Sequence, residues 1–442
     1  NVQGVVSEDK INCLSHWLED RGHQSGIVYV TLQQTAEEVA KQLRQRNIPA
    51  QAYHAGMNSE RRQEIQQQFM ASSQGVIVAT IAFGMGIDKS DIRFVVHYDL
   101  PKSIENYAQE IGRAGRDGLS ADCLVLANND NLNVLENFVY GDTPEPQAIA
   151  YVLNEISQCS DGVQGREKGQ WDIVLNSLSN QSNIRLLSLK TLLVYLELFE
   201  VIKPIYSYFA EYKYKFLLPK EELLARFKGE RQDFVNAIFN TSDMARTWAT
   251  VNFEQINQLY PSERNRVVTA LDYLDQQGMI ELQTKQMTQV YQILKTGLDI
   301  EQLTASLFER FSAKEQSEIK RIHQLLAFFA SDVCLSRQLA HYFADKQLEV
   351  DCGHCSVCAG QIARFPSVPE LMPLQQFDFS GLSRGICEKL GKGATSVLIS
   401  RFFCGLTTPV FTRIKARSLT GFAQLDKYRF AEVKAWVESH YQ

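Results

Sequence analysis

Four cysteines in the last quarter of the chain have the spacing of a metal site. Cys334 is followed, after seventeen intervening residues, by Cys352, Cys355 and Cys358 in a C-x-x-C-x-x-C run. Four thiolates suit a tetrahedral zinc ion and leave no coordination position open for a substrate. We therefore expect a structural Zn²⁺ site, with an iron–sulfur cluster or buried free cysteines as the alternatives. The remaining cysteines lie in apolar contexts and are expected only to pack: Cys13, Cys123, Cys159, Cys387 and Cys404.

A second group of reactive side chains lies in the segment QEIGRAGRDG, which begins at Gln109. Arg113 and Arg116 are three residues apart, so on a helix they would share one face. Guanidinium groups stay charged and can bond phosphate oxygens through two donors, which suits arginine fingers on the γ-phosphate of a nucleotide. Taken alone, such a pair could equally be a surface pair balanced by nearby glutamates.

A glycine-rich turn upstream could meet the same ligand. The segment VATIAFGMGIDK begins at Val78, and a strand is expected to end at Thr80 within it. The glycines that follow allow the backbone to approach a ligand closely, and the Thr80 hydroxyl could bond a backbone phosphate. Two further segments accompany it, YHAGM from Tyr53 and RFVVHYDLP from Arg93.

These four segments, in this order and spacing, resemble the second motor lobe of RecQ-family DNA helicases. The resemblance is dense over residues 10–140 and returns in the cysteine module near residues 315–358. It implies a RecA-like lobe, the use of ATP and Mg²⁺, translocation on single-stranded DNA and 3′-to-5′ unwinding, in DNA repair or recombination.

The resemblance also implies roles for single residues. Arg116 would be the main arginine finger with Arg113 beside it, and Gln109 would couple the nucleotide to the DNA. The remaining implied contacts are Gly86 and Asp88 near the nucleotide, and His54 and Thr80 on the DNA strand. For His54 the alternative is a loop histidine whose hydrogen bonds are satisfied within the protein.

The phosphate-binding loop of such a motor is missing from the sequence. No G-x-x-x-x-G-K-[ST] segment occurs, and the nearest lookalike, Gly391-Lys392-Gly393, lacks both the spacing and a preceding strand. The acidic Mg²⁺-binding motif is missing too. We therefore expect the chain to begin after the first motor lobe and to hydrolyse no ATP by itself.

The motifs of the lobe need a parallel sheet to position them. Over residues 1–145 strand-like and helix-like segments alternate, which predicts a parallel sheet covered by helices on both faces. The expected strands cover residues 27–30, 50–53, 75–80, 94–97 and 123–127. The expected helices cover residues 35–45, 59–70 and 104–111.

The rest of the chain divides into several smaller pieces, so the expected fold class is multidomain α/β plus α+β. Residues 146–300 are expected to be a winged-helix region, tandem or inserted, with two α+β pieces packed for stability as the alternative. Helices 184–199 and 266–276 are each followed by two strand-like runs, 201–209 with 212–218 and 279–282 with 289–294, which we expect to form two hairpins. A four-cysteine zinc-binding helical module at 301–363, a linker at 364–381 and a basic helical C-terminal module at 382–442 complete the prediction.

The order of these pieces departs from the usual family order. Commonly the zinc module follows the motor lobe directly, whereas residues 160–300 stand between them here as if inserted. No strand-separating hairpin is therefore assigned.

Two further stretches could contact DNA. Lys213 and Lys215 alternate with aromatic residues, so one set would face outward and could meet bases or phosphates. Tyrosines packed on a helix are the alternative. In the C-terminal module Arg413, Lys415 and Arg417 belong to a locally basic group, for which a solvated helical face is the alternative.

Composition limits what the whole chain can be. The 442 residues carry 45 Lys+Arg against 51 Asp+Glu, a net charge of −6, so any DNA site must come from local basic clusters. The length suggests about three domains. No uncharged apolar run reaches the roughly 18 residues of a membrane span, and membrane partners are not expected. The cysteine usage predicts an intracellular protein, and the lack of a long Lys/Arg run favours the bacterial cytoplasm over the nucleus.

The expected partners are single-stranded and forked or 3′-tailed DNA, with a single-stranded-DNA-binding protein as a possible further partner. Two rival functions remain open. One is a zinc-containing winged-helix DNA-binding regulator without motor activity, and the other is an RNA helicase. The sequence does not fix the oligomeric state.

Overall fold

The computed structural model describes residues 1–22, 24–84, 86–129, 132–160, 169–345, 347, 349–367 and 370–440. Met85 of the glycine-rich segment and Pro369 of the expected linker lie outside the described residues. The chain divides into two compact units, one made of residues 1–143 and 310–442 and the other of residues 144–309. Each unit is described by itself.

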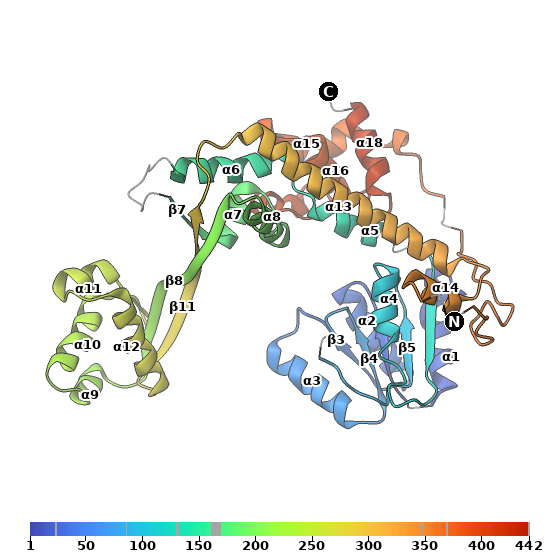
Figure 1. The fold of residues 1–442 in the computed structure, drawn as a ribbon, viewed down its shortest axis with the longest axis horizontal. Coiled ribbons are helices and arrows are strands. Elements are labelled where there is room, and N and C mark those ends of the chain that lie inside the picture. The colour runs from blue at the N-terminus through green and yellow to red at the C-terminus, as the bar shows by residue number, and fades with distance from the viewer. Residues whose placement is uncertain are drawn as a thin grey trace. The chain divides into compact units, whose positions relative to one another are not determined.

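A six-stranded parallel sheet organises the first unit (Figure 1). Its strand order is β1-β6-β5-β2-β4-β3, and every neighbouring pair is parallel. The strands are β1 (Val2–Gly4), β2 (Ser25–Tyr29), β3 (Ala50–Tyr53), β4 (Gly75–Ala79), β5 (Phe94–His97) and β6 (Asp122–Ala127). Short β-branched runs form the central strands because both of their faces are buried. The predicted parallel sheet is confirmed, while β1 was not foreseen.

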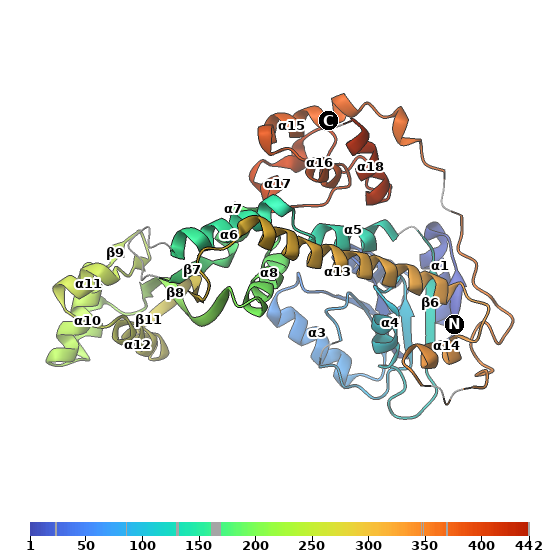
Figure 2. The ribbon, with the colours of Figure 1, turned by 45° about the horizontal axis from the view of Figure 1, so that its top comes forward.

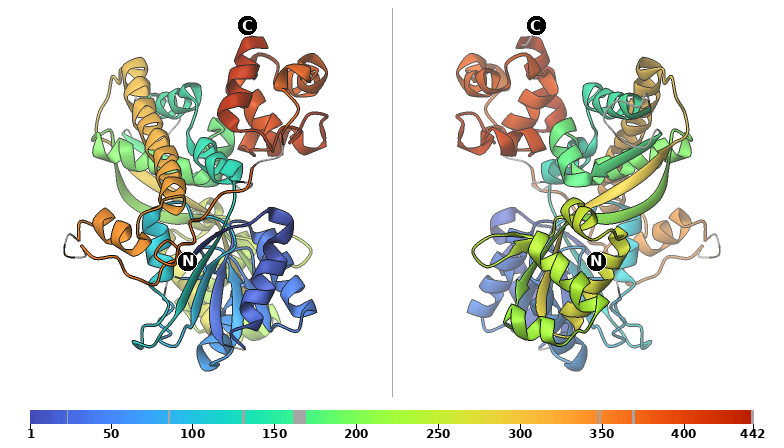
Figure 3. Two further views of the ribbon diagram at one scale, coloured as in Figure 1. Left: turned by 90° about the vertical axis from the view of Figure 1, so that its right-hand side faces the viewer. Right: turned by 90° about the vertical axis from the view of Figure 1, so that its left-hand side faces the viewer.

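Helices cover both faces of this sheet (Figure 3). They are α1 (Lys10–Glu19), α2 (Gln33–Gln45), α3 (Ser59–Ala71), α4 (Ile104–Ile111) and α5 (Leu132–Asp142). One core joins Leu14 of α1 and Val39 of α2 to Val28 and Val78 of the sheet. A second core, on the other face, includes Ile65 of α3. The doubly covered α/β lobe is therefore confirmed, and α1 and α5 are additions to the predicted helices.

The cysteine module and the C-terminal module complete the first unit. Helix α13 (Ile300–Phe329) belongs to this unit from Arg310 onward, and α14 (Leu335–Tyr342) follows it. The C-terminal helices lie together as a small bundle (Figure 2) around a core that includes Phe402 and Trp436. They are α15 (Phe379–Leu390), α16 (Ser396–Phe403), α17 (Pro409–Arg413) and α18 (Phe430–His440).

A long two-stranded ribbon organises the second unit. Strands β8 (Ile202–Phe216) and β11 (Ile280–Ile293) pair antiparallel along their whole length, as Figure 3 shows in green and yellow. The two predicted hairpins are therefore wrong, because each pair of runs is one continuous strand. Neither expected turn contains glycine, proline or asparagine, so nothing in residues 210–211 or 283–288 reverses the chain.

Each end of the ribbon carries its own group of helices (Figure 1). One group is α6 (Pro146–Ser160), α7 (Leu175–Ser182) and α8 (Leu186–Leu198), and it is accompanied by β7 (Gln170–Val174). The other group is α9 (Lys220–Ala225), α10 (Glu230–Thr241), α11 (Phe253–Leu259) and α12 (Arg264–Gln276), with the short strands β9 (Asp243–Met244) and β10 (Ala249–Thr250).

The two groups are nested winged-helix arrangements. The order α6, β7, α7, α8, β8, β11, with β7 paired to β11, is helix–strand–helix–helix–strand–strand. The second group lies between the inner halves of β8 and β11, the last two strands of the first. Within it α10, β10, α11, α12 and the outer half of β11 follow the order helix–strand–helix–helix–strand. The outer half of β8 precedes them in the chain, pairs with β10 and occupies the place of the last strand. The second winged helix is thus inserted into the wing of the first.

No helix among the described residues combines the length and the apolar character that crossing a membrane requires.

Candidate nucleotide cleft and metal centre

A cleft of about 840 Å³ lies at the carboxyl ends of the central strands. Ligands of open parallel sheets bind at this edge, because the loops that leave the strands converge there. Its walls come from the segments after β2, β4 and β5 and from α4 and α5. The lining residues that matter below are Leu32, Thr80, Ile81, Lys102, Gln109, Arg113 and Phe138.

The two arginines of the GRAGR segment diverge instead of sharing a helix face. Helix α4 ends at Ile111, and residues 112–118 form turns in which Gly115 has a φ of +64°. The expected helical arrangement is therefore wrong, because the glycines end the helix between Gln109 and the arginines.

Arg113 turns inward and fixes the glycine-rich turn. It is only 9% exposed, and its Nη1 donates to the carbonyl oxygen of Gly84 at 2.6 Å. A Cβ on Gly84 would lie 2.5 Å from Arg113 Nη2, so any side chain there would force the guanidinium to shift. Arg113 thus holds the turn after β4 in place.

Arg116 turns outward and pairs with Asp88. Its Nη1 donates to Asp88 Oδ1 at 2.7 Å, and the Asp88 side chain is 90% exposed. Gly86, which begins this turn, has a φ of +81° and is exposed. An ion pair this open contributes little stability, so Arg116 can exchange its carboxylate for a phosphate at low cost.

The other expected site residues separate into two groups. Gln109 and Thr80 both line the cleft, with Gln109 exposed and Thr80 buried. His54 does not line it, and its Nε2 lies 3.0 Å from Glu37 Oε1. The structure therefore brings Thr80, Gln109 and Arg113 together, whereas His54 is partnered within the protein.

A buried polar network beside the cleft was not foreseen. His97 Nε2 lies 2.6 Å from Glu110 Oε2, and both side chains are at least nine-tenths buried. Asp99 accepts from the backbone of Thr31 at 2.9 Å and lies 3.7 Å from Lys10 Nζ. The RFVVHYDLP segment held a signal for it, since His97 and Asp99 are polar residues at the end of a buried strand.

Tyr29 belongs to the same network. Its hydroxyl donates to the carbonyl oxygen of Phe83 at 3.0 Å, and its ring stacks on His97 with centroids 5.6 Å apart. Burial raises the pKa of Tyr29, so its hydroxyl stays protonated and keeps donating. The network thus ties β2, β5 and the turn after β4 into one rigid wall.

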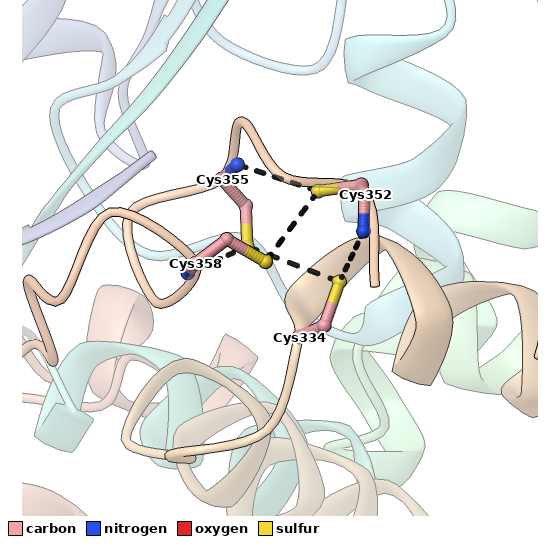
Figure 4. Close-up of side chains that lie close together, drawn as sticks. All are labelled: Cys334, Cys352, Cys355 and Cys358. Atoms are coloured by element: carbon pink, nitrogen blue, oxygen red, sulfur yellow. Dashed lines mark hydrogen bonds between the residues drawn. The ribbon is translucent and has the colours of Figure 1, made fainter. Parts of the chain in front are cut away.

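The four cysteines predicted to bind metal converge (Figure 4). The Sγ atoms of Cys334, Cys352, Cys355 and Cys358 all lie within 4.8 Å of one another. The separations include 3.5 Å for Cys355–Cys358 and 4.0 Å for Cys352–Cys358, close to the roughly 3.8 Å of a tetrahedral zinc–thiolate site. The donor set fits a structural zinc ion with no open position.

Local hydrogen bonds favour thiolates at this centre. Burial opposes ionisation of Cys352, but hydrogen bonds from Ser336 and from the backbone of His354 and Cys355 outweigh it and lower its pKa to about 6. The contact with Cys355 raises the pKa of Cys358 to about 12. Without a cation, therefore, the four thiols do not all ionise together. Zinc binding would release the protons that remain on the thiols, such as that of Cys358.

The metal centre is joined to the helix that carries Gln109. Tyr107 of α4 packs edge-to-face on Phe329 with ring centroids 5.0 Å apart. Tyr342 of α14 donates to Glu105 at 2.7 Å, and one core includes Tyr107 together with Cys334 and Cys355. The cysteine module therefore supports the wall of the cleft.

The two lysines of the ribbon each form an ion pair with a glutamate. Lys213 lies 2.6 Å from Glu211, and Lys215 lies 3.6 Å from Glu281. The aromatic residues of the same strand divide, since Tyr214 is buried in the core and Tyr206 is 55% exposed.

The basic residues of the C-terminal module also divide. Arg413, Lys415 and Arg417 are exposed. Arg401, another basic residue of this module, is instead buried and donates to the carbonyl oxygen of Tyr140 at 3.0 Å. It therefore adds no charge to the surface.

Comparison with known proteins identifies two parts of the chain. Residues 9–118 match the family model described as helicase conserved C-terminal domain, and residues 273–359 match the model described as RecQ zinc-binding. The chain contains the C-terminal helicase region of a RecQ-family protein. The model that matches the cysteine module names RecQ, and the model that matches the lobe names helicases in general.

Individual proteins similar in sequence to this chain are named as DNA helicases. The ATP-dependent DNA helicase RecQ of Pasteurella multocida is 52% identical over 140 residues, which cover 31% of this chain and 22% of that protein. RecQ of Bacillus subtilis is 41% identical over 157 residues, 36% of this chain and 26% of that protein. The Arabidopsis thaliana protein "ATP-dependent DNA helicase Q-like 5" is 28% identical over 308 residues, 68% of this chain and 32% of that protein.

The chain therefore spans between about a fifth and a third of the length of these RecQ-family relatives. Among solved structures, the Escherichia coli DEAD-box protein SrmB shares 27% identity over 30% of this chain and 78% of that chain, with a TM-score of 0.28, too low to bear on the fold.

Proposed function

We propose that the complete protein is an ATP-dependent DNA helicase that moves 3′ to 5′ along single-stranded DNA and acts in DNA repair or recombination. The proposal rests chiefly on the turn after β4. Arg113, which lines the cleft, fixes this turn, and the turn presents the outward Arg116–Asp88 pair, which does not line the cleft. The second support is the set of DNA helicases among the relatives.

In this mechanism ATP would supply the phosphoryl group and Mg²⁺ would neutralise its charge. A first motor lobe would hold most of the nucleotide and the metal ion. Arg116 would leave Asp88 and bond the γ-phosphate as an arginine finger. Gln109, beside Thr80 in the cleft, would sense that change and shift the DNA strand near Thr80. Because this sequence has no phosphate-binding loop, the 442-residue chain alone would hydrolyse no ATP.

ATP turnover, with and without single-stranded DNA, tests the motor. Arg116→Ala in the complete protein should lower DNA-stimulated turnover by about 10³-fold or more and leave DNA binding unchanged. Unchanged turnover, or turnover by the 442-residue chain alone, would contradict the mechanism. Tighter binding of 3′-tailed RNA than of matched DNA would make the protein an RNA helicase instead.

We also propose that DNA contacts Arg413, Lys415 and Arg417 of the C-terminal module. They are exposed, and the structure records no ion pair for them among the residues it describes. Charge reversal at Lys415 and Arg417 should flatten the salt dependence of binding to 3′-tailed DNA. An unchanged slope would remove this surface from the proposal. Lys213 and Lys215 would have to leave Glu211 and Glu281 before they could contact DNA.

A further inference from the structure

An aromatic side chain stands on the wall of the cleft, outside the segments that carry the family resemblance. Phe138 of α5 lines the cleft and is 38% exposed. Its neighbour Leu135, one turn earlier, is 2% exposed and belongs to the core behind the cleft. The core therefore anchors α5, while the Phe138 ring remains accessible.

A cation accompanies this ring. Lys102 Nζ lies 5.4 Å from the centroid of the Phe138 ring, and Lys102 also lines the cleft. Within the described part of the chain, the structure records no carboxylate within 4 Å of this ammonium. The positive charge is thus available to a ligand that also covers the ring.

The rest of the wall matches a flat, partly apolar and anionic ligand. Leu32 is 40% exposed and Ile81 is 50% exposed. Both acids that line the cleft are occupied, Asp99 by Lys10 and Thr31 and Glu110 by His97. A nucleotide has these properties, because its base has an apolar π-face and its phosphate is an anion.

We propose that Phe138 is a stacking platform for one base of a single strand that crosses the cleft, and that Lys102 contacts an adjoining phosphate. The inference rests on the proposed function, since it takes DNA as the source of the nucleotide. Thr80, on the same cleft, lies on the implied path of the strand. A free nucleotide shares this chemistry, so the experiment separates the two sources.

The test measures binding of the full chain to an oligothymidylate and to the same backbone with abasic sites. Phe138→Leu keeps an apolar side chain on the wall of the cleft but removes the π-face. It should weaken binding to the oligothymidylate about fivefold or more and leave binding to the abasic strand unchanged. Phe138→Trp should restore the affinity. Lys102→Ala should weaken both strands alike and lower the salt slope by about one.

Phe343→Leu is the matched control, because Phe343 is 51% exposed and does not line the cleft. If the unchanged chain binds neither strand, the proposed function fails and this inference with it. If the chain binds DNA and Phe138→Leu behaves like Phe343→Leu, the inference alone is overturned. If Phe138→Leu weakens ATP binding and leaves oligothymidylate binding unchanged, the inference is also overturned. The Phe138 ring would then stack on the base of a free nucleotide.

Discussion

Arg113 and Arg116 have opposite environments although they lie close together in the sequence. Arg113 is buried against the carbonyl oxygen of Gly84, and Arg116 reaches into solvent beside Asp88. The difference arises because the helix ends at Ile111 and the backbone then turns. Arg113 is therefore committed to holding a loop, whereas Arg116 is accessible from solvent and can change partners.

The first prediction tests the contact between Gly84 and Arg113. Gly84→Ala should lower the free energy of unfolding by about 1–3 kcal/mol, because the new Cβ would lie 2.5 Å from Arg113 Nη2. Gly393→Ala is the control, since a Cβ there meets nothing within 4 Å and no positive φ is involved. Urea unfolding of both variants provides the measurement. Equal stability of the two would show that the guanidinium moves aside freely.

At the residue scale, the sequence predicts a site when the residue types and their spacing are rare outside such sites. The four cysteines were predicted as metal ligands because closely spaced cysteines rarely serve another purpose. The two arginines were predicted because the glycines around them form a distinctive segment. The sequence marks His97 and Asp99 as polar residues at the end of a strand. It does not reveal their partners Glu110 and Lys10, since each pair joins different elements. The direction of Arg113 also depends on where α4 ends, which the sequence pattern did not specify.

At the scale of elements, the thiol cluster and a hydrophobic core together hold the cysteine module. Residues 343–367 contain no helix or strand among those described. They are joined to α14 by the thiol cluster, by the Arg337–Asp351 ion pair at 2.9 Å and by the core that includes Leu335 and Ala363. Ser356, within the cysteine run, accepts a hydrogen bond from the backbone of Val2 at 3.1 Å. The cysteine module is therefore tied to the edge of the sheet as well as to α4.

The second prediction is that the chain binds one zinc ion and that Cys355→Ser loses it. Loss of zinc should unfold residues 343–367 and expose the core around Tyr107, because structural zinc contributes directly to folding. Metal analysis and limited proteolysis measure the two effects. Cys387→Ser, outside the cluster, should retain zinc and resist the protease as the unchanged chain does. Full zinc content in Cys355→Ser would refute the ligand set.

The third prediction concerns the stability of the C-terminal module at alkaline pH. Burial, with a smaller contribution from Asp426, raises the pKa of the Cys404 thiol to about 12 from an ordinary 9.0. The folded state therefore holds this proton more tightly, so its contribution to stability is complete below about pH 9 and is lost as the pH rises toward about 12. The loss from this thiol at about pH 11 should be about 2–3 kcal/mol.

Cys404→Ala isolates this contribution from other groups that titrate at high pH. The variant should be less stable at about pH 8, because it leaves a small cavity, but its stability should fall less between about pH 8 and about pH 11. Urea unfolding at the two pH values gives both differences. Parallel losses in the variant and the unchanged chain would mean that Cys404 ionises as easily when folded.

At the scale of the whole molecule, the second unit shows what local patterns cannot predict. The helices at 184–199 and 266–276 were foreseen within a few residues, and they are α8 and α12. Their strands were assigned to local hairpins because adjacent runs usually pair. The pairing of Ile202 with Ile293 and of Phe216 with Ile280 is nonlocal, so only the folded chain reveals that one winged helix is inserted into another.

The last prediction is that the inserted winged helix can be removed without unfolding the first. Phe209 and Met287 are directly paired across the ribbon, so a two-residue Asn-Gly turn can join them in place of residues 210–286. The strand pairs of β7 with β11 remain, as do buried residues such as Trp171 and Leu192. We expect the free energy of unfolding of the shortened unit to change by about 1 kcal/mol or less.

A control variant with a shifted strand register tests whether the stability of the shortened unit depends on correct pairing at the new turn. Joining Phe209 to Thr288 with the same turn would slip the pairing by one residue and place the core side chains of β11 on the wrong face. That variant should be poorly folded by circular dichroism and thermal unfolding, while the in-register variant should keep a cooperative transition. Collapse of both would mean that the two winged helices fold as one unit, because the first would then depend on contacts made by the inserted one, such as Arg264 over the Tyr208 ring at 5.2 Å.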